Sequence, residues 1–389
     1  MPGFELIGKE ELFEVQTVFK ESGILFRHSF DNLRNGIYKV KDFENSFSAY
    51  MKTPFSLAVT SGTAALRVAL ASLNVKNGDE IITQSFTFVA TAEAIIESNA
   101  TPVFTEIDDT LNMDPDDLEN KISSKTKAVI VVHMLGTPAR LRKIKLICDK
   151  YDIPIIEDTA WGCGGLYEDI PLGTYGKIGT YSFDFAKTMT TGEGGMIVFN
   201  DEDLYKKAAA WHDHGHENNP KLPRWEDSRS SSGFNYRMME LQGAIGLAQL
   251  KKLNYVIKKQ RANSNAIKLE IADLPITFRS IPKKSFETSD ALIFFVKNNQ
   301  VARDCRSALL KNGIGTKILP EAISWHFAGT WDHMDPIKKL KKNQSEVLFK
   351  KSLFYLDSKV YGYVSRSGAL NFGFNQCKIR ALSAIKAKK

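Results

Sequence analysis

The stretch GTYSFDFAKTMTTGEGGMIVF, residues 179–199, decides the fold class of this chain. Two apolar, strand-like runs flank a short loop that contains Lys187, and a glycine-rich turn follows the loop. A lysine in a mostly apolar, hydroxyl-rich loop can have a lowered pKa, which allows it to form a Schiff base with an aldehyde. For any single lysine, an ordinary exposed side chain is the alternative.

An acidic pair ends a second strand-like run, IPIIEDTA (153–160). Ligands of open α/β sheets bind beyond the carboxyl ends of the strands, and Asp158 is expected at such an end. A carboxylate there can bind a metal, bind a ribose or pair with a protonated ring nitrogen. A strand-end aspartate that only caps the following turn is the simpler alternative.

A third signal is SGTAAL (61–66), which lies between the strand-like SLAV and an apolar helix. A Ser-Gly-Thr turn at a helix N-terminus offers free backbone N–H groups, hydroxyl groups and the positive end of the helix dipole, which together suit a phosphate. An ordinary helix cap is the alternative. An electron-sink cofactor needs a lysine for its aldehyde, a carboxylate for its ring nitrogen and a phosphate cradle, and candidates for all three occur here.

Outward from these motifs, strand-like and helical segments alternate as far as residue 200. The run AVIVV (128–132) is continuously apolar, which is typical of a strand buried on both faces. The pattern predicts an α/β fold with a mostly parallel central sheet covered by helices. The expected strands are 80–82, 102–104 and 153–156, and the expected helices are 9–21, 87–98 and 139–151.

The pattern changes after residue 200. A polar loop over 212–233 precedes a long helical pattern from about 238 to 269, and ALIFFV (291–296) with a helix over 300–312 predicts a smaller α+β unit. We therefore expect a large cofactor-binding domain with an N-terminal segment (1–255) and a small C-terminal domain (256–389). Residues 25–40 are expected to be irregular.

Composition excludes several classes of protein. Of 389 residues, 43% are hydrophobic and 25% charged, as in globular proteins, and a net charge of +7 over this length does not indicate nucleic-acid binding. The four cysteines have no CxxC spacing, and the alternating His212, His214 and His216 lack suitable further ligands, so no metal site is expected. Without a signal peptide or an apolar run of about 20 residues, we expect a cytoplasmic protein with no membrane insertion.

These segments resemble the DegT/DnrJ/StrS family of sugar aminotransferases, which use pyridoxal 5′-phosphate on the type I aminotransferase fold. The resemblance spans residues 1 to about 335. Within the family, PGFELIGKEE (2–11), LFRHSFDNLRN (25–35), SFD-x-x-KT and DHGHENN (213–219) are similar to the 8-amino-3,8-dideoxy-manno-octulosonate transaminases. The motifs that carry the family resemblance are SGTAAL (61–66), QSFTFVATAEAI (84–95), VHMLG (132–136), EDTA (157–160), SFDFAKTMTTGEGG (182–195) and GFNYRMMELQGAIGLAQL (233–250).

The resemblance implies roles for individual residues. Lys187 holds the coenzyme and moves the proton, while Asp158 pairs with the ring nitrogen and keeps it protonated. A homodimer with shared active sites is implied, because Asn235 is expected to reach the phosphate of the neighbouring subunit's coenzyme. Where the family usually has Gln near the phenolic oxygen of the coenzyme, this chain has Trp161. The remaining implied coenzyme contacts are Gly62, Thr63 and Ser182 to the phosphate and Phe88 to the ring face.

The implied reaction moves an amino group from glutamate to a keto or aldehyde sugar. The preferred acceptor is 8-oxo-3-deoxy-manno-octulosonate, which would give 8-amino-3,8-dideoxy-manno-octulosonate for lipopolysaccharide biosynthesis. The acid group of that acceptor needs a cation, and a bidentate arginine suits it. Arg27, His28 and Arg34 are the candidates, with solvated surface arginines as the alternative. His326 lies in an aromatic cluster that either packs the second domain or contacts the sugar.

Two other functions remain open. The acceptor can instead be a 3- or 4-keto nucleotide-linked deoxysugar. The residues that distinguish the two acceptors are expected in the loops 25–40, 212–232 and 315–335, whose sequences do not favour either acceptor. A non-enzymatic, pyridoxal-phosphate-binding regulator is the second. Such regulators usually carry a basic DNA-binding module, for which this sequence has no spare segment. Nucleotide-binding motifs of the GxGxxG and GxxxxGK types are not found.

Overall fold

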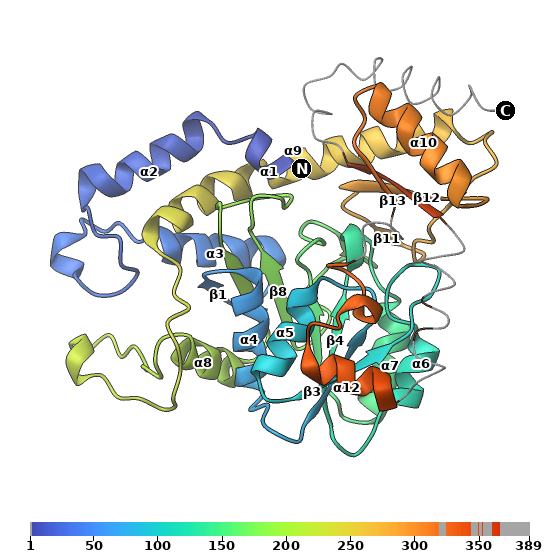
Figure 1. The fold of residues 1–389 in the computed structure, drawn as a ribbon. Helices are drawn as coiled ribbons and strands as arrows, with labels where there is room; N and C mark the ends of the chain where they lie inside the picture. The colour runs from blue at the N-terminus through green and yellow to red at the C-terminus, as the bar shows by residue number, and fades with distance from the viewer. Residues whose placement is uncertain (1, 319–323, 344–348, 350–351, 353–359, 366–389) are drawn as a thin grey trace.

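The computed structural model describes residues 2–318, 324–343, 349, 352 and 360–365. Its centre is a seven-stranded sheet in the order β1-β9-β8-β5-β4-β2-β3 (Figure 1). The five strands from β8 to β3 run parallel, whereas β9 is antiparallel to both of its neighbours. The predicted mostly parallel α/β sheet is therefore confirmed. The strands are β1 (Phe55–Val59), β2 (Glu80–Gln84), β3 (Thr101–Thr105), β4 (Thr126–Val132), β5 (Ile155–Asp158), β8 (Ile178–Ser182) and β9 (Gly195–Phe199).

Helices cover both faces of this sheet, which explains the continuously apolar strands. In β4, Ala128, Ile130 and Val132 pack into one hydrophobic cluster, and Val129 and Val131 pack into another on the opposite face. The first cluster includes residues of α4 and α5, and the second includes residues of α7. The helices up to the end of the long one are α1 (Pro2–Glu5), α2 (Lys9–Glu21), α3 (Lys39–Met51), α4 (Gly62–Ser72), α5 (Val89–Glu97), α6 (Pro115–Lys121), α7 (Leu141–Lys150), α8 (Glu202–Trp211) and α9 (Glu240–Glu270).

Helix α3 was not predicted from the sequence. Its buried residues Val40, Phe43 and Phe47 recur at helical spacing and face α9 and the sheet. The close approach of the two helices depends on glycine, because a Cβ atom at Gly246 would lie 2.5 Å from the ring of Phe43. The apolar spacing was visible in the sequence, but the partner helix lies about 200 residues away.

The smaller α+β unit predicted after the long helix is present. A four-stranded antiparallel sheet has the order β10-β12-β14-β13, and α10 (Asn299–Lys311) contacts three of its strands. Helix α9 extends from the large sheet toward this unit (Figure 1), so the boundary expected at residue 255 falls inside α9 and stays a prediction. The other elements are β10 (Thr277–Phe278), β12 (Ala291–Val296), β13 (Thr316–Ile318), β14 (Val360–Ser365), α12 (Asp335–Asn343), and β11 (Ser285–Phe286) with β6 (Leu166–Tyr167) and β7 (Ile170–Pro171) in a third sheet.

The segment after residue 324 returns to the large sheet. Phe327, Trp331 and Ile337 are buried in the same cluster as the residues of β2 and β4. Trp331 donates its indole N–H to the carbonyl of Ser324 at 2.9 Å, which fixes the turn. In the part of the chain that the structure describes, every helix is too short or too polar to span a membrane.

Candidate active site

A cavity of about 290 Å³ opens where the parallel strands end. Strand β5 ends at Asp158 and strand β8 at Ser182, and both residues line the cavity. The structure thus brings seven of the sequence-predicted residues to one place, as expected for the carboxyl edge of an open sheet. The seven are Gly62, Thr63, Phe88, Asp158, Ser182, Lys187 and His326.

Lys187 lies in the loop that joins β8 to β9. Its backbone N–H donates to the carbonyl of Asp184 at 3.0 Å, and its carbonyl accepts from the N–H of Gly3 at 3.2 Å. Burial lowers the pKa of Lys187, while the carboxylates of Asp184, Asp158 and Asp290 act in the opposite direction. A lowered pKa makes the neutral, nucleophilic amine more accessible near neutral pH.

The carboxylate of Asp158 is held in one orientation. Its Oδ2 accepts from the hydroxyl of Thr91 at 2.9 Å, and its Oδ1 accepts from the backbone N–H of Ala160 at 3.2 Å. The Thr91 hydroxyl is itself 2.8 Å from that of Thr87. Burial raises the pKa of Asp158, and the two hydrogen bonds and the charge of Lys187 offset part of that effect. A fixed, buried carboxylate of this kind is suited to pairing with a cationic ring nitrogen.

The carboxylate of the neighbouring Glu157 forms its hydrogen bonds with other groups of the protein. It accepts backbone N–H groups from Gly173, Tyr175 and Gly176 at 2.7–2.9 Å and lies 2.9 Å from Nε2 of His133. Because the N–H of Ala139 donates to Nδ1 of His133, the ring carries its proton on Nε2 and donates it to Glu157. Of the acidic pair, only Asp158 lines the cavity.

The N-terminus of α4 forms one wall of the cavity. The hydroxyl of Ser61 accepts from the N–H of Ala64 at 3.0 Å, whereas the first-turn amides of Gly62 and Thr63 have no preceding helical carbonyl to bind. A Cβ atom at position 62 would lie 2.7 Å from Cβ of Ser182, so only glycine fits here. Free amides, two hydroxyl groups and the helix dipole suit an anionic phosphate.

Aromatic side chains also line the cavity, among them Phe88 and Trp161. Phe88 is 38% exposed and stacks on Trp325, with ring centroids 6.1 Å apart and an interplanar angle of 19°. The backbone N–H groups of Thr87 and Val89 donate to the carbonyls of His326 and Trp325, both at 2.9 Å. The segment around residue 325 is therefore fixed against the loop that begins α5. This pairing of the two segments was not predicted from the sequence.

Four sequence-predicted residues lie outside the cavity of this chain. Arg27 donates to both carboxylate oxygens of Glu44, at 2.8 and 3.0 Å, and Arg34 is fully buried with its Nη1 3.2 Å from Glu240. Their charges are thus used within the protein, which corrects the expectation of free cations for a substrate acid group in the same chain. The other two are His28, 3.4 Å from Asp213, and the exposed Asn235.

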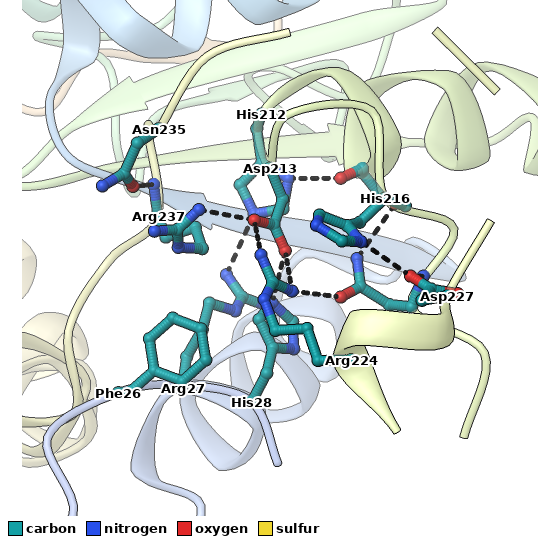
Figure 2. A network of polar contacts seen from close by, with 12 residues as sticks. Phe26, Arg27, His28, His212, Asp213, His216, Arg224, Asp227, Asn235 and Arg237 are labelled. Carbon is teal, nitrogen blue, oxygen red and sulfur yellow. Dashed lines mark hydrogen bonds and ion pairs between the residues drawn. The ribbon is translucent and has the colours of Figure 1, made fainter. Parts of the chain in front are cut away.

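Asp213 is the centre of a network that joins the N-terminal segment to the polar loop over 212–237 (Figure 2). Arg224 and Arg237 both form ion pairs with its carboxylate. His212 directly follows α8, with its Nε2 3.5 Å from Nη1 of Arg27, whereas His216 pairs with Asp227. Among the residues that the structure describes, no three potential metal ligands cluster.

This network predicts a loss of stability in mild acid. Burial, followed by the charge of Arg27, lowers the pKa of His28 to about 2 and that of His212 to about 3, whereas unfolded histidines titrate near about 6.5. Below that pH the unfolded chain binds two protons that the folded chain does not, so stability falls as pH falls. We expect the free energy of unfolding to drop by on the order of 2 kcal/mol between about pH 7 and 5.5.

Urea unfolding followed by circular dichroism at a series of pH values measures this drop. His212→Gln should flatten the pH dependence, and His333→Gln, which changes an exposed histidine, should leave it as in the wild type. A wild-type free energy that stays constant over this range would contradict the prediction.

Comparisons with known proteins agree with this geometry. The model of the DegT/DnrJ/EryC1/StrS aminotransferase family matches residues 29–353. GDP-perosamine synthase of Vibrio cholerae is 34% identical over 275 residues, covering 67% of this chain and 74% of the relative. The enzyme of the same name from Escherichia coli O157:H7 is 34% identical over 279 residues, covering 72% and 75%.

Solved structures show the same fold. An aminotransferase from Psychrobacter cryohalolentis matches with a TM-score of 0.82 and 24% identity, covering 98% of this chain and 97% of its own. PseC of Helicobacter pylori, an aminotransferase involved in the biosynthesis of pseudoaminic acid, matches with a TM-score of 0.80 and 23% identity over the same shares of the two chains.

Proposed function

The chain belongs to the DegT/DnrJ/EryC1/StrS aminotransferase family, and from this premise we propose that it moves an amino group from glutamate to a sugar at the cavity beside Lys187. The enzyme is a sugar aminotransferase, and its coenzyme is pyridoxal 5′-phosphate. The observation that supports the site most directly is the convergence of Lys187, Asp158 and the N-terminus of α4 on one cavity.

The residues around the cavity fit this coenzyme. The amides of Gly62 and Thr63 and the hydroxyl of Ser182 would hold the phosphate, and the glycine is the residue that leaves room beside Ser182. Asp158 would pair with the ring nitrogen, and Phe88 would contact the ring face. When bound, the coenzyme delocalises the electron pair that remains when a carbon loses its proton.

In this proposal each chain residue has one task. In the first half of the reaction, Nζ of Lys187 would take the proton from the donor's carbon and deliver it to C4′ of the coenzyme, as a general base and then a general acid, and in the second half it would move a proton in the reverse direction. A pKa lowered by burial keeps that nitrogen able to accept a proton. Asp158, fixed by Thr91 and Ala160, would supply the negative charge that keeps the ring nitrogen protonated.

For the acceptor we propose 8-oxo-3-deoxy-manno-octulosonate, with the amino sugar destined for lipopolysaccharide. Similarity of the N-terminal motifs to octulosonate transaminases supports this choice. The second candidate is a keto sugar linked to a nucleotide, which is favoured by the 34% identity to two GDP-perosamine synthases. A purely regulatory function loses support because the matched family consists of aminotransferases.

A donor–acceptor assay separates these acceptors. Coenzyme-loaded protein is incubated with glutamate and either C8-oxidised octulosonate or a GDP-linked 4-keto deoxysugar, and amino-sugar formation is followed by mass spectrometry. Faster amination of the octulosonate supports the proposal, and faster amination of the nucleotide sugar replaces it with the second candidate. Turnover of neither, with no loss of visible absorption on adding glutamate, would contradict an aminotransferase reaction at this site.

We also propose a homodimer in which Asn235 reaches the partner's site. Asn235 is exposed and lies outside the cavity of its own chain, next to the exposed Phe234 and Met239. On the N-terminal helix α2, Leu12, Phe13 and Phe19 are also more than half exposed, which is typical of surfaces that bind a partner.

Subunit mixing tests the shared site. Inactive Lys187→Ala chains and Asn235→Ala chains, when exchanged, should form mixed dimers in which one site contains both defects and the other contains none. Activity should therefore rise above the mean of the two parent proteins. Activity equal to that mean, together with a monomeric mass in analytical ultracentrifugation, would contradict the shared dimer.

A further inference from the structure

Trp161 follows the strand that ends at Asp158 and lines the cavity. Nζ of Lys187 lies 4.0 Å from the centroid of the Trp161 ring, which is the geometry of a cation–π contact. The indole also packs against the main hydrophobic cluster, and its backbone carbonyl accepts a long hydrogen bond from Thr288. The ring face beside the lysine is therefore held by the surrounding core.

The indole N–H does not explain this orientation. Nε1 of Trp161 is buried and has no hydrogen-bond partner among the described residues. A buried donor without a partner carries a desolvation penalty, so some other interaction must favour this placement of the ring. The contact between its face and Lys187 is the polar interaction that the side chain makes.

The carboxylates around Lys187 favour its ammonium form, as the contact with the indole face does. Burial alone disfavours the ammonium form, and Asp184, Asp158 and Asp290 favour it through their charges. The negative face of an indole ring adds to this effect, and it does so without a carboxylate that could itself take the lysine's proton.

We propose that Trp161 is a positioning residue that holds the unlinked ammonium group of Lys187 against its indole face on the wall of the cavity. Once the free Lys187 has accepted a proton, the ring keeps the resulting ammonium beside the reacting atoms and stabilises it there until the proton is passed on. This inference rests on the proposed role of Lys187 as the proton carrier. It assigns to Trp161 a function that depends on its aromatic face and not on its N–H group.

The test compares Trp161→Phe with Trp161→Leu, two side chains of similar size of which one keeps an aromatic face. The full-length chain is stripped of coenzyme, and amidination of Lys187 by methyl acetimidate is measured by peptide mass spectrometry across a pH series. The midpoint of the profile reports the pKa of the lysine, and the plateau at high pH reports access of the reagent.

We expect the midpoint of Trp161→Leu to fall by about one pH unit, which is about tenfold more free amine, or about 1.4 kcal/mol, below the midpoint. Trp161→Phe should keep most of the wild-type value. Trp225→Leu, which changes a tryptophan that is 85% exposed, is the matched control and should not shift. Wild-type midpoints in both Trp161 variants, or equal shifts in both, would overturn the proposal.

Folding and function are controlled separately. Circular dichroism checks each variant, and Trp161→Met replaces Trp161→Leu if that protein does not fold. Because the titration is done without coenzyme or donor, its result does not depend on transamination. If the proposed function itself is wrong, the wild-type protein will bind no coenzyme at Lys187, whatever the midpoints of the three variants are.

Discussion

Replacement of Lys187 by alanine is expected to lower kcat with glutamate and the acceptor sugar by at least about 10³-fold. The side chain is the one amine among the residues that line the cavity, and it lies near the buried carboxylate of Asp158. Without it, no group in the described part of the cavity can both link the coenzyme and carry the proton. Steady-state kinetics of the purified variant measure the loss.

The variant should nevertheless fold and bind the coenzyme's phosphate, since the amides at the start of α4 are unchanged. Lys206→Ala, which changes a lysine on the exposed face of α8, is the matched control and should retain wild-type kcat. Activity of Lys187→Ala within tenfold of the wild type would contradict the assigned role.

Asp158→Asn is expected to lower kcat by about 10²–10³-fold, the size of effect seen when a preorganised electrostatic partner is removed. Asparagine keeps the shape of the side chain, but its single amide oxygen can accept only one of the two hydrogen bonds that Thr91 and Ala160 donate to the carboxylate. It cannot place a negative charge opposite the ring nitrogen, so the ring loses its protonated form. The measurement is kcat together with the visible spectrum of the coenzyme-loaded protein.

The control for this variant is Asp149→Asn, an exposed carboxylate that pairs with Lys145 on α7. Its kcat should equal that of the wild type. If Asp158→Asn were as active as Asp149→Asn and had an unchanged spectrum, the proposal that Asp158 keeps the ring nitrogen protonated would be wrong.

Sequence patterns predicted the structure correctly where the residues that form the pattern lie close together in the chain. The apolar run of β4, the strand end at Asp158 and the loop of Lys187 each lie within a few residues, and the fold brings these residues together because carboxyl ends of parallel strands share one edge. Helix α2 was predicted with its observed bounds, Lys9–Glu21, because its apolar spacing is continuous.

Long-range pairing could not be predicted in the same way. Arg34 meets Glu240, which is 206 residues away, and Arg27 meets Glu44 in a helix that the sequence did not reveal. An arginine in an irregular segment has the same pattern whether it binds a substrate or a buried glutamate. The position of Trp325 beside Phe88 depends on backbone hydrogen bonds to the loop before α5, which have no signature in the periodicity of the sequence.

Borohydride reduction of the coenzyme-loaded wild-type protein, followed by peptide mapping, tests the central claim most directly. The account predicts one peptide with covalently attached coenzyme, modified at Lys187, and none from the Lys187→Ala variant. Attachment at a different lysine, or no attachment in protein that has bound the coenzyme, would contradict it.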